Sequence, residues 1–336
     1  MNSKDEIVKV FENKGGDAHP PAIFTQTGTV AQMDVCGARW PEANDNPELM
    51  AKLALQCPKQ FGFATVRVPF CITVDADTFG CEINPGTESS QPSVIGSRYR
   101  GDYEINDVPD DLISPEEFMA GRRVNVVLDA AKIIGKEENL FRVAGMNGPV
   151  ACIDNLLGME NVLMAMMMEP EKIDNWLKAV TPHLTAYAEA LSEVSDAVTI
   201  IEEAATDMFP PDFFDSIYTP YLPPVIKGAQ KDAWAVTHTC GTTMEIADRL
   251  ASLGQDGISL EVSADPQAYL DLIGGKCVTL GAINPIETLL SKTPADIVAE
   301  AKKSAEFGFD LVTPECGVPP LTPNENLDAL AHYREL

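Results

Sequence analysis

Short apolar segments alternate with longer amphipathic stretches along nearly the whole of this 336-residue chain. The segments with β-strand character are 21–25, 64–68, 125–128, 141–144, 197–201, 234–237, 257–260, 277–280 and 310–313. Stretches such as 171–190 and 294–305 carry apolar residues at helical spacing. This alternation is typical of parallel strands joined by crossover helices, and about eight strands in this length favour a closed barrel. We therefore predict an α/β fold, a (β/α)8 TIM barrel with an N-terminal helical extension, built as one domain over residues 1–336.

The charge of the chain argues against two kinds of partner. The chain carries 51 acidic and 24 basic residues, a formal net charge of −27. Nucleic acids and anionic membrane surfaces would be repelled, so we expect no nucleic acid and no membrane as a partner. No apolar run reaches the about 18 residues of a membrane span, and the N-terminal residues show no signal-peptide pattern. We expect a cytoplasmic protein whose 8 cysteines are reduced and mostly buried.

Side chains that bind soft metals stand at the ends of two predicted strands. His238 and Cys240 follow the strand at 234–237, and Gly241 then provides a turn. Residues i and i+2 of a strand point to the same side, so one ion could contact both side chains. Cys316 follows the last predicted strand, and all C-terminal strand ends of a barrel face a common mouth. One imidazole and two thiols match a catalytic zinc site with an open fourth position; the alternative is a core cysteine beside a hydrogen-bonded histidine.

Other polar residues follow the predicted strands and extend this candidate site. Glu261 ends the strand at 257–260 and is a candidate fourth zinc ligand, the alternative being a solvated carboxylate. Asn147 and Gly148, at the predicted mouth, are candidate cofactor-binding residues. Three glutamates could orient His238 by accepting a hydrogen bond from its ring: Glu202, Glu203 and Glu315. The methionine-rich stretch at 164–168 has a helical pattern, and we interpret it as core packing.

The motif His238-Thr239-Cys240-Gly241, with the distant Glu315-Cys316-Gly317, resembles the zinc motif of the methylcobamide:coenzyme M methyltransferases, which are barrels of the uroporphyrinogen-decarboxylase superfamily. Further matching segments are 25–28, 33–35, 40–43, 46–50, 80–84, 91–94 and 322–326. The resemblance thus extends through most of the chain. It implies a single-domain barrel with one zinc ion, acting on a methyl group delivered by a separate corrinoid protein.

The resemblance implies transfer of a methyl group from methyl-Co(III) of a methylated corrinoid protein to the thiol of coenzyme M, in methane formation from methylated compounds. Zn²⁺ held by His238, Cys240 and Cys316 would deprotonate the thiol, and the thiolate would attack the methyl carbon. Corrinoid-binding domains contribute an Asp-x-His-x-x-Gly loop, which none of the 4 histidines forms. The methylcobamide would therefore be supplied by a partner protein. Arg67 and Arg39 could contact the sulfonate, although such arginines are more often structural ion-pair partners.

Three other functions are compatible with parts of this pattern. A first-step methyltransferase, which moves a methyl group from a small donor onto the corrinoid protein, shares part of the zinc motif. Uroporphyrinogen decarboxylase shares the barrel, but it needs several arginines near its N-terminus, and residues 1–30 contain none. A barrel used only as a scaffold for the corrinoid protein would not need an imidazole and two thiols at its strand ends.

Overall fold

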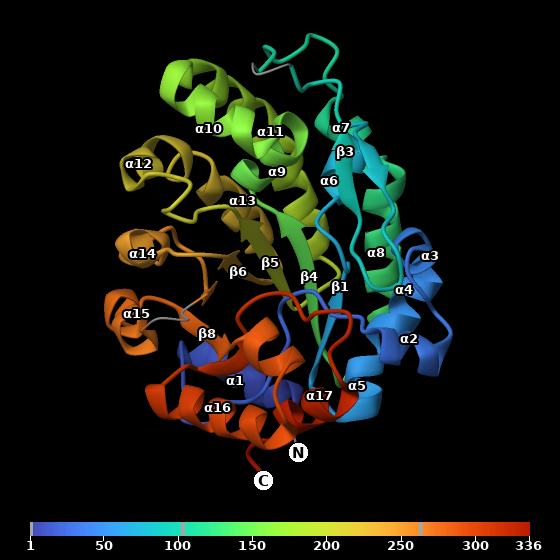
Figure 1. The fold of residues 1–336 in the computed structure, drawn as a ribbon. Coiled ribbons are helices and arrows are strands. Elements are labelled where there is room, and N and C mark those ends of the chain that lie inside the picture. Colours follow the sequence, from blue (N-terminus) through green and yellow to red (C-terminus); the bar gives the residue numbers. More distant parts are fainter. Residues whose placement is uncertain (1–2, 102–104, 262–264) are drawn as a thin grey trace.

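The computed structural model describes residues 3–101, 105–261 and 265–336, whose strands form one curved parallel sheet and one hairpin (Figure 1). The strands are β1 (Thr65–Val68), β2 (Glu82–Asn84), β3 (Ser93–Gly96), β4 (Phe141–Asn147), β5 (Ala197–Glu202), β6 (Trp234–Thr239), β7 (Gly257–Leu260), β8 (Val278–Ile283) and β9 (Leu311–Pro314). In the described part of the chain the large sheet has seven strands in the order β1-β4-β5-β6-β7-β8-β9, all parallel. The antiparallel pair β2–β3 forms the hairpin.

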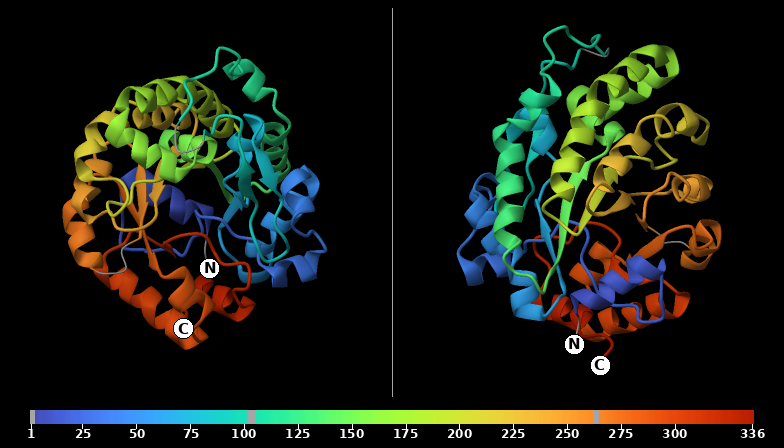
Figure 2. Two further views of the ribbon diagram at one scale, coloured as in Figure 1. Left: turned by 45° about the horizontal axis from the view of Figure 1, so that its top comes forward. Right: turned by 180° about the vertical axis from the view of Figure 1, so that it is seen from behind.

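Helices surround this sheet on its outer side (Figure 2). The α-helices are α1 (Lys4–Asn13), α2 (Val30–Cys36), α3 (Glu42–Asp45), α4 (Pro47–Ala54), α5 (Gln56–Phe61), α6 (Val74–Thr78), α7 (Pro115–Met119), α8 (Arg122–Ile134), α9 (Pro149–Leu157), α10 (Met159–Met168), α11 (Pro170–Ser192), α12 (Phe214–Ile217), α13 (Leu222–Ala229), α14 (Ala247–Leu250), α15 (Pro266–Ile273), α16 (Pro294–Phe307) and α17 (Asn324–Ala331). Three shorter helical segments are η1 (Pro211–Phe213), η2 (Met244–Ile246) and the π-helical η3 (Pro285–Leu290). The helices predicted at 171–190 and 294–305 are thus confirmed as α11 and α16.

The segment at residues 20–25, which we call the closing segment, lies between β9 and β1 in place of an eighth strand. Pro21 makes a single parallel bridge with Val312 of β9. On the other side, the Ile23 N–H donates to Thr65 Oγ1 of β1 at 2.9 Å. Pro21 has no N–H and cannot extend a ladder, which limits this predicted strand to a bridge. The predicted α/β barrel is confirmed, with its eighth position filled in this way.

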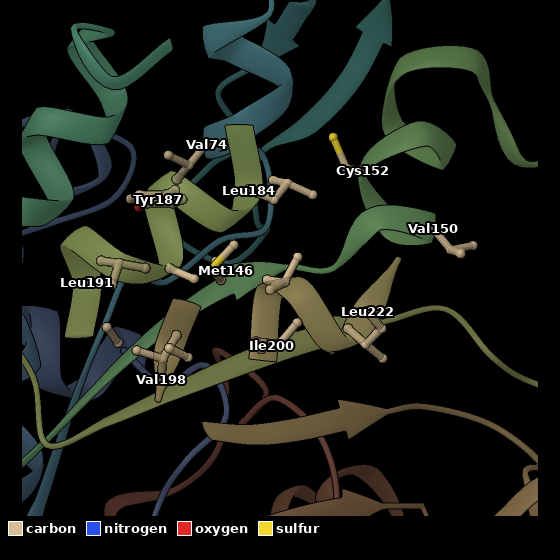
Figure 3. Packing of buried hydrophobic residues seen from close by; sticks show 14 of the residues in the cluster. Val74, Met146, Val150, Cys152, Leu184, Tyr187, Leu191, Val198, Ile200 and Leu222 are labelled. Carbon is tan, nitrogen blue, oxygen red and sulfur yellow. The ribbon is translucent and has the colours of Figure 1, made fainter. Parts of the chain in front are cut away.

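Alternation along the strands separates an exterior core from the barrel interior. Met146 of β4 and Val198 and Ile200 of β5 face outward and belong to one buried cluster with Leu184 of α11 and Leu222 of α13 (Figure 3). Their neighbours in sequence therefore point into the barrel. This alternation decides which residues reach the mouth.

Four aromatic rings fill the barrel interior at the N-terminal ends of the strands. Phe11 of α1 stacks on Trp234 of β6 and on Phe141 of β4, with ring centroids 5.2 and 5.9 Å apart. Phe24 of the closing segment lies 5.8 Å from Phe141. In Figure 1, α1 crosses this end of the barrel, near both termini. The N-terminal helical extension therefore plugs the end of the barrel opposite the mouth.

The strand predicted at residues 125–128 is wrong, because these residues lie inside α8. The buried residues of α8 include Val124, Val127, Ala131 and Ile134, which follow the three- and four-residue spacing of a helix. The valines of this stretch have high strand propensity, but packing of one helix face determines the outcome.

The packing interpretation of the methionine stretch is wrong for two of its residues. Met166 of α10 is 3% exposed, whereas Met167 and Met168 are 68% and 81% exposed. The helix buries its other side through Val162 and Ala165, so its last two methionines face away from the core.

Within the described ranges, no single helix is long and apolar enough to cross a membrane; α9 and α10 meet that criterion only as a pair bent by 107°.

Candidate metal site

Three donor atoms converge at the C-terminal ends of β6 and β9. His238 Nε2 lies 3.1 Å from Cys240 Sγ, and Cys240 Sγ lies 3.1 Å from Cys316 Sγ. One ligand atom from each residue can be chosen so that all lie within 4.8 Å of one another. The imidazole is buried and the two thiols are half-buried. The structure therefore brings together the three residues that the sequence pattern selects.

Local backbone geometry places the two thiols. His238 and Cys240 stand two residues apart and project to the same side of the chain at the end of β6. Gly241 then turns the chain with φ +74°, and a Cβ at this position would lie 2.8 Å from the Cβ of Ala205. Cys316 follows β9, and its backbone is held by the closing segment, because Thr25 Oγ1 donates to the Cys316 carbonyl at 2.8 Å.

Ser259 of β7 orients the imidazole. Its Oγ lies 2.9 Å from His238 Nδ1, and both residues are buried. Because Nδ1 is occupied by this contact, Nε2 is the ring nitrogen that faces the thiols. We predicted a glutamate in this role; β6–β7 pairing instead places Ser259 directly opposite His238 in the register.

The two thiols share a strongly polarised environment. The hydrogen bond with Cys240, with His238 nearby, lowers the pKa of Cys316. The same hydrogen bond, together with burial, raises the pKa of Cys240. The two sulfur atoms thus lie within hydrogen-bonding distance of each other, at a place where a dication would bind two thiolates.

Glu261 stands beside this cluster and is tied to the turn. Its Oε2 accepts a hydrogen bond from the Gly241 N–H at 2.8 Å. The three-residue donor cluster found among the described residues does not include it. Its assignment as a fourth ligand stays a prediction.

The glutamates after β5 have separate surroundings. Glu202 is fully buried and accepts hydrogen bonds from the Val150 and Ala151 N–H groups at the start of α9, at 3.0 and 2.9 Å. Burial raises the pKa of Glu202 to about 8 although these hydrogen bonds oppose the shift. Burial also raises the pKa of Glu203, whose charge interacts with those of His238 and Cys316. Glu203 is therefore the glutamate of this pair that acts electrostatically on the metal site.

The remaining predicted mouth residues contact neighbouring polar groups of the protein. Asn147 Nδ2 donates to the Ile72 carbonyl at 2.7 Å and to Asp75 Oδ1 at 2.9 Å. A Cβ on Gly148 would lie 2.7 Å from the Glu202 carboxyl, so this glycine gives the carboxylate access to α9. Their role in cofactor binding stays a prediction. Glu315 lines a groove between β8 and α16.

Replacing Ser259 by alanine is expected to weaken zinc binding by about 10- to 100-fold, because the imidazole loses the contact that fixes its orientation. Competition with a chromogenic zinc chelator measures the affinity. The matched control is Ser252→Ala, an exposed serine that bonds Asp248, for which no change in affinity is expected. Equal affinities of the two variants would contradict the orienting role of Ser259.

The fold is a parallel α/β barrel, and one imidazole and two thiols lie together at the C-terminal ends of its strands. These features define a class of barrel proteins whose mouth is suited to bind a metal ion such as zinc. The family model for uroporphyrinogen decarboxylase (URO-D) matches residues 2–335. The chain belongs to this family.

Several named proteins are similar to the chain over nearly its whole length. A methylcobamide:CoM methyltransferase, MtaA, of Methanosarcina barkeri is 34% identical, covering 99% of this chain and 97% of the relative. A second methylcobamide:CoM methyltransferase, MtbA, of Methanosarcina acetivorans is 29% identical, with 97% and 96% covered. A solved methyltransferase from Methanosarcina mazei superposes with a TM-score of 0.90 at 34% identity, covering 100% of this chain and 99% of that chain. The similarity therefore extends over the whole barrel.

Proposed function

We propose that this chain is a zinc-dependent methyltransferase that moves a methyl group from a methylated corrinoid protein to the thiol of coenzyme M, giving methyl-coenzyme M. The observation that carries the proposal is the convergence of His238, Cys240 and Cys316 at the barrel mouth. Full-length similarity to proteins named methylcobamide:CoM methyltransferases supports the reaction class and the corrinoid and coenzyme M substrates. As one barrel domain in the cytoplasm, the enzyme would serve methane formation from methylated compounds.

The donor set fits zinc. One neutral imidazole and two thiolates are ligands that zinc prefers, and two thiolates balance the charge of a dication. His238, Cys240 and Cys316 would hold the ion, with Glu261 as the candidate fourth ligand before substrate binds. When bound, zinc supplies a Lewis acid that lowers the pKa of a substrate thiol toward neutrality.

Two neighbouring residues hold the candidate metal ligands in position. Ser259 fixes the imidazole, and Thr25 fixes the backbone of Cys316. The substrate thiol releases its proton to the medium, and its sulfur then forms a bond to the methyl carbon. The Co–C bond breaks at the same time, with both electrons left on cobalt as Co(I). A thiol bound at the strand ends would be accessible to a partner protein that presents the methyl group from outside the barrel.

Methyl transfer from free methylcobalamin to coenzyme M is expected to depend on zinc. The purified protein should consume the methyl-cobalt absorbance and form methyl-coenzyme M, and removal of zinc by a chelator should abolish both. Restoring zinc to the stripped sample is the control and should restore the rate. A zinc-loaded protein without turnover would contradict the proposed acceptor and favour the first-step transfer from a small methylated donor onto the corrinoid protein.

A further inference from the structure

Arg67 of β1 is a buried arginine whose head group is incompletely paired. Its side chain is 1% exposed, and its Nη1 donates to the Pro69 carbonyl. In the described structure, Nε and Nη2 have no hydrogen-bond partner. Among the described residues, the titratable groups near enough to influence the guanidinium are the thiols of Cys71 and Cys316 and the phenol of Tyr187, and none of them is a carboxylate. Burying a guanidinium in this state is costly, because its hydration is lost without a counter-ion.

The guanidinium lies inside the barrel. Val66 and Val68 belong to the exterior core, so Arg67 between them faces the interior. A Cβ on Gly145 of the neighbouring strand β4 would lie 1.9 Å from Arg67 Nη2. The head group therefore rests on the backbone of β4, in space that only a glycine at this position leaves open.

Arg67 and the metal site flank the closing segment. Ile23 is bonded to Thr65, so Thr25, two residues later, lies level with Arg67. Thr25 in turn is bonded to the carbonyl of Cys316. Neighbouring strands lie about 4.8 Å apart, so β1 and β9, with one segment between them, are separated by about 10 Å. The unpaired donors thus lie at the height of the thiols, within the reach of a small substrate.

We propose that Arg67 binds the anionic end of the thiol substrate, which in coenzyme M is the sulfonate. This inference rests on the proposed function and assigns the part of the substrate that does not react. Coenzyme M carries its thiol and its sulfonate at opposite ends of a two-carbon chain, so a thiol at the metal site brings the sulfonate toward β1. Its oxygens supply acceptors for Nε and Nη2, in the planar arrangement that a guanidinium favours.

Arg39, the other arginine that the sequence offers for this role, has carboxylate partners. It is half-exposed and forms ion pairs with Asp34 and with Glu88, the latter at 2.9 Å. Arg39 is therefore a structural residue, and it provides a matched control for Arg67.

The test compares binding of three thiols to the zinc-loaded protein by isothermal titration calorimetry. The thiols are coenzyme M, 3-mercaptopropionate, in which a carboxylate replaces the sulfonate, and uncharged 2-mercaptoethanol. The unmodified protein is expected to bind coenzyme M at least about 30-fold more tightly than 2-mercaptoethanol, as one charged hydrogen-bonding contact would give. Arg67→Met should reduce this ratio to about 3-fold or less, whereas Arg39→Met should leave it unchanged.

Gly145→Ala provides a second variant that keeps the arginine in place. The added Cβ would displace Nη2, so the preference for coenzyme M should fall while binding of 2-mercaptoethanol and zinc content are kept. Circular dichroism and zinc analysis establish that each variant is folded and loaded before titration.

The outcomes separate this inference from the proposed function. A preference for coenzyme M that persists in folded Arg67→Met, or no preference in the unmodified protein, would overturn the role of Arg67. An Arg67-dependent preference that 3-mercaptopropionate shares equally would support an anion site and identify a carboxylate as an equally good ligand. Arg67-dependent thiol binding without any methyl transfer would reject the proposed function and leave the binding role intact.

Discussion

Replacement of Cys240 by alanine is expected to release zinc and to lower the rate of methyl transfer at least about 1,000-fold. The metal contributes several kcal/mol to ionising and positioning the thiol, and each 1.4 kcal/mol corresponds to about a factor of ten. Cys316→Ala should have the same effect, because either change leaves one imidazole and one thiol. Zinc content by atomic absorption and turnover with methylcobalamin are the two measurements.

The barrel itself should survive these substitutions. Cys240 and Cys316 are half-buried at the strand ends and lie outside the hydrophobic clusters. Cys36, a half-buried cysteine of α2, is the matched control, and Cys36→Ala should retain zinc and rate. A Cys240 variant with full zinc and full rate would reject the site assignment.

Replacement of Phe141 by alanine is expected to lower the free energy of unfolding by about 3–5 kcal/mol, the cost of deleting a fully buried aromatic ring. Phe141 is 0% exposed and contacts three other aromatic rings of the interior plug, those of Phe11, Phe24 and Trp234. Chemical denaturation followed by circular dichroism measures the change.

The control for this variant is Leu321→Ala, at a position that is 63% exposed. Its effect should be within about 0.5 kcal/mol, as for most surface substitutions. An equally small effect of Phe141→Ala would contradict a stabilising role of the four aromatic rings in the barrel interior.

The periodicity of the sequence predicts the barrel because parallel strands are buried on both faces and form short continuous apolar runs. Segments such as 197–201 and 257–260 are confirmed as β5 and β7 for this reason. The same signal fails at 125–128, where a valine-rich helix face has the composition of a strand. It also gives no indication of the β2–β3 hairpin, whose residues are exposed or half-buried and lack a clear alternation.

The donor residues of the site are predictable because strand spacing and the common mouth suffice to place His238, Cys240 and Cys316. Their supporting contacts are not predictable in this way. The contact between Ser259 and His238 depends on the register of two strands, and a serine in an apolar run carries no signal of its own. Likewise, the unpaired donors of Arg67 become visible only when every neighbour is known.

The closing segment has a consequence for the order of events during synthesis. It binds residues that stand 291 positions later in the chain, so the ring stays open until β9 has left the ribosome. A nascent chain that lacks β9 carries His238 and Cys240 without the second thiol. If the proposed zinc site forms, stable capture of the ion would follow completion of the fold, and a truncated translation product would lack one of the three donors.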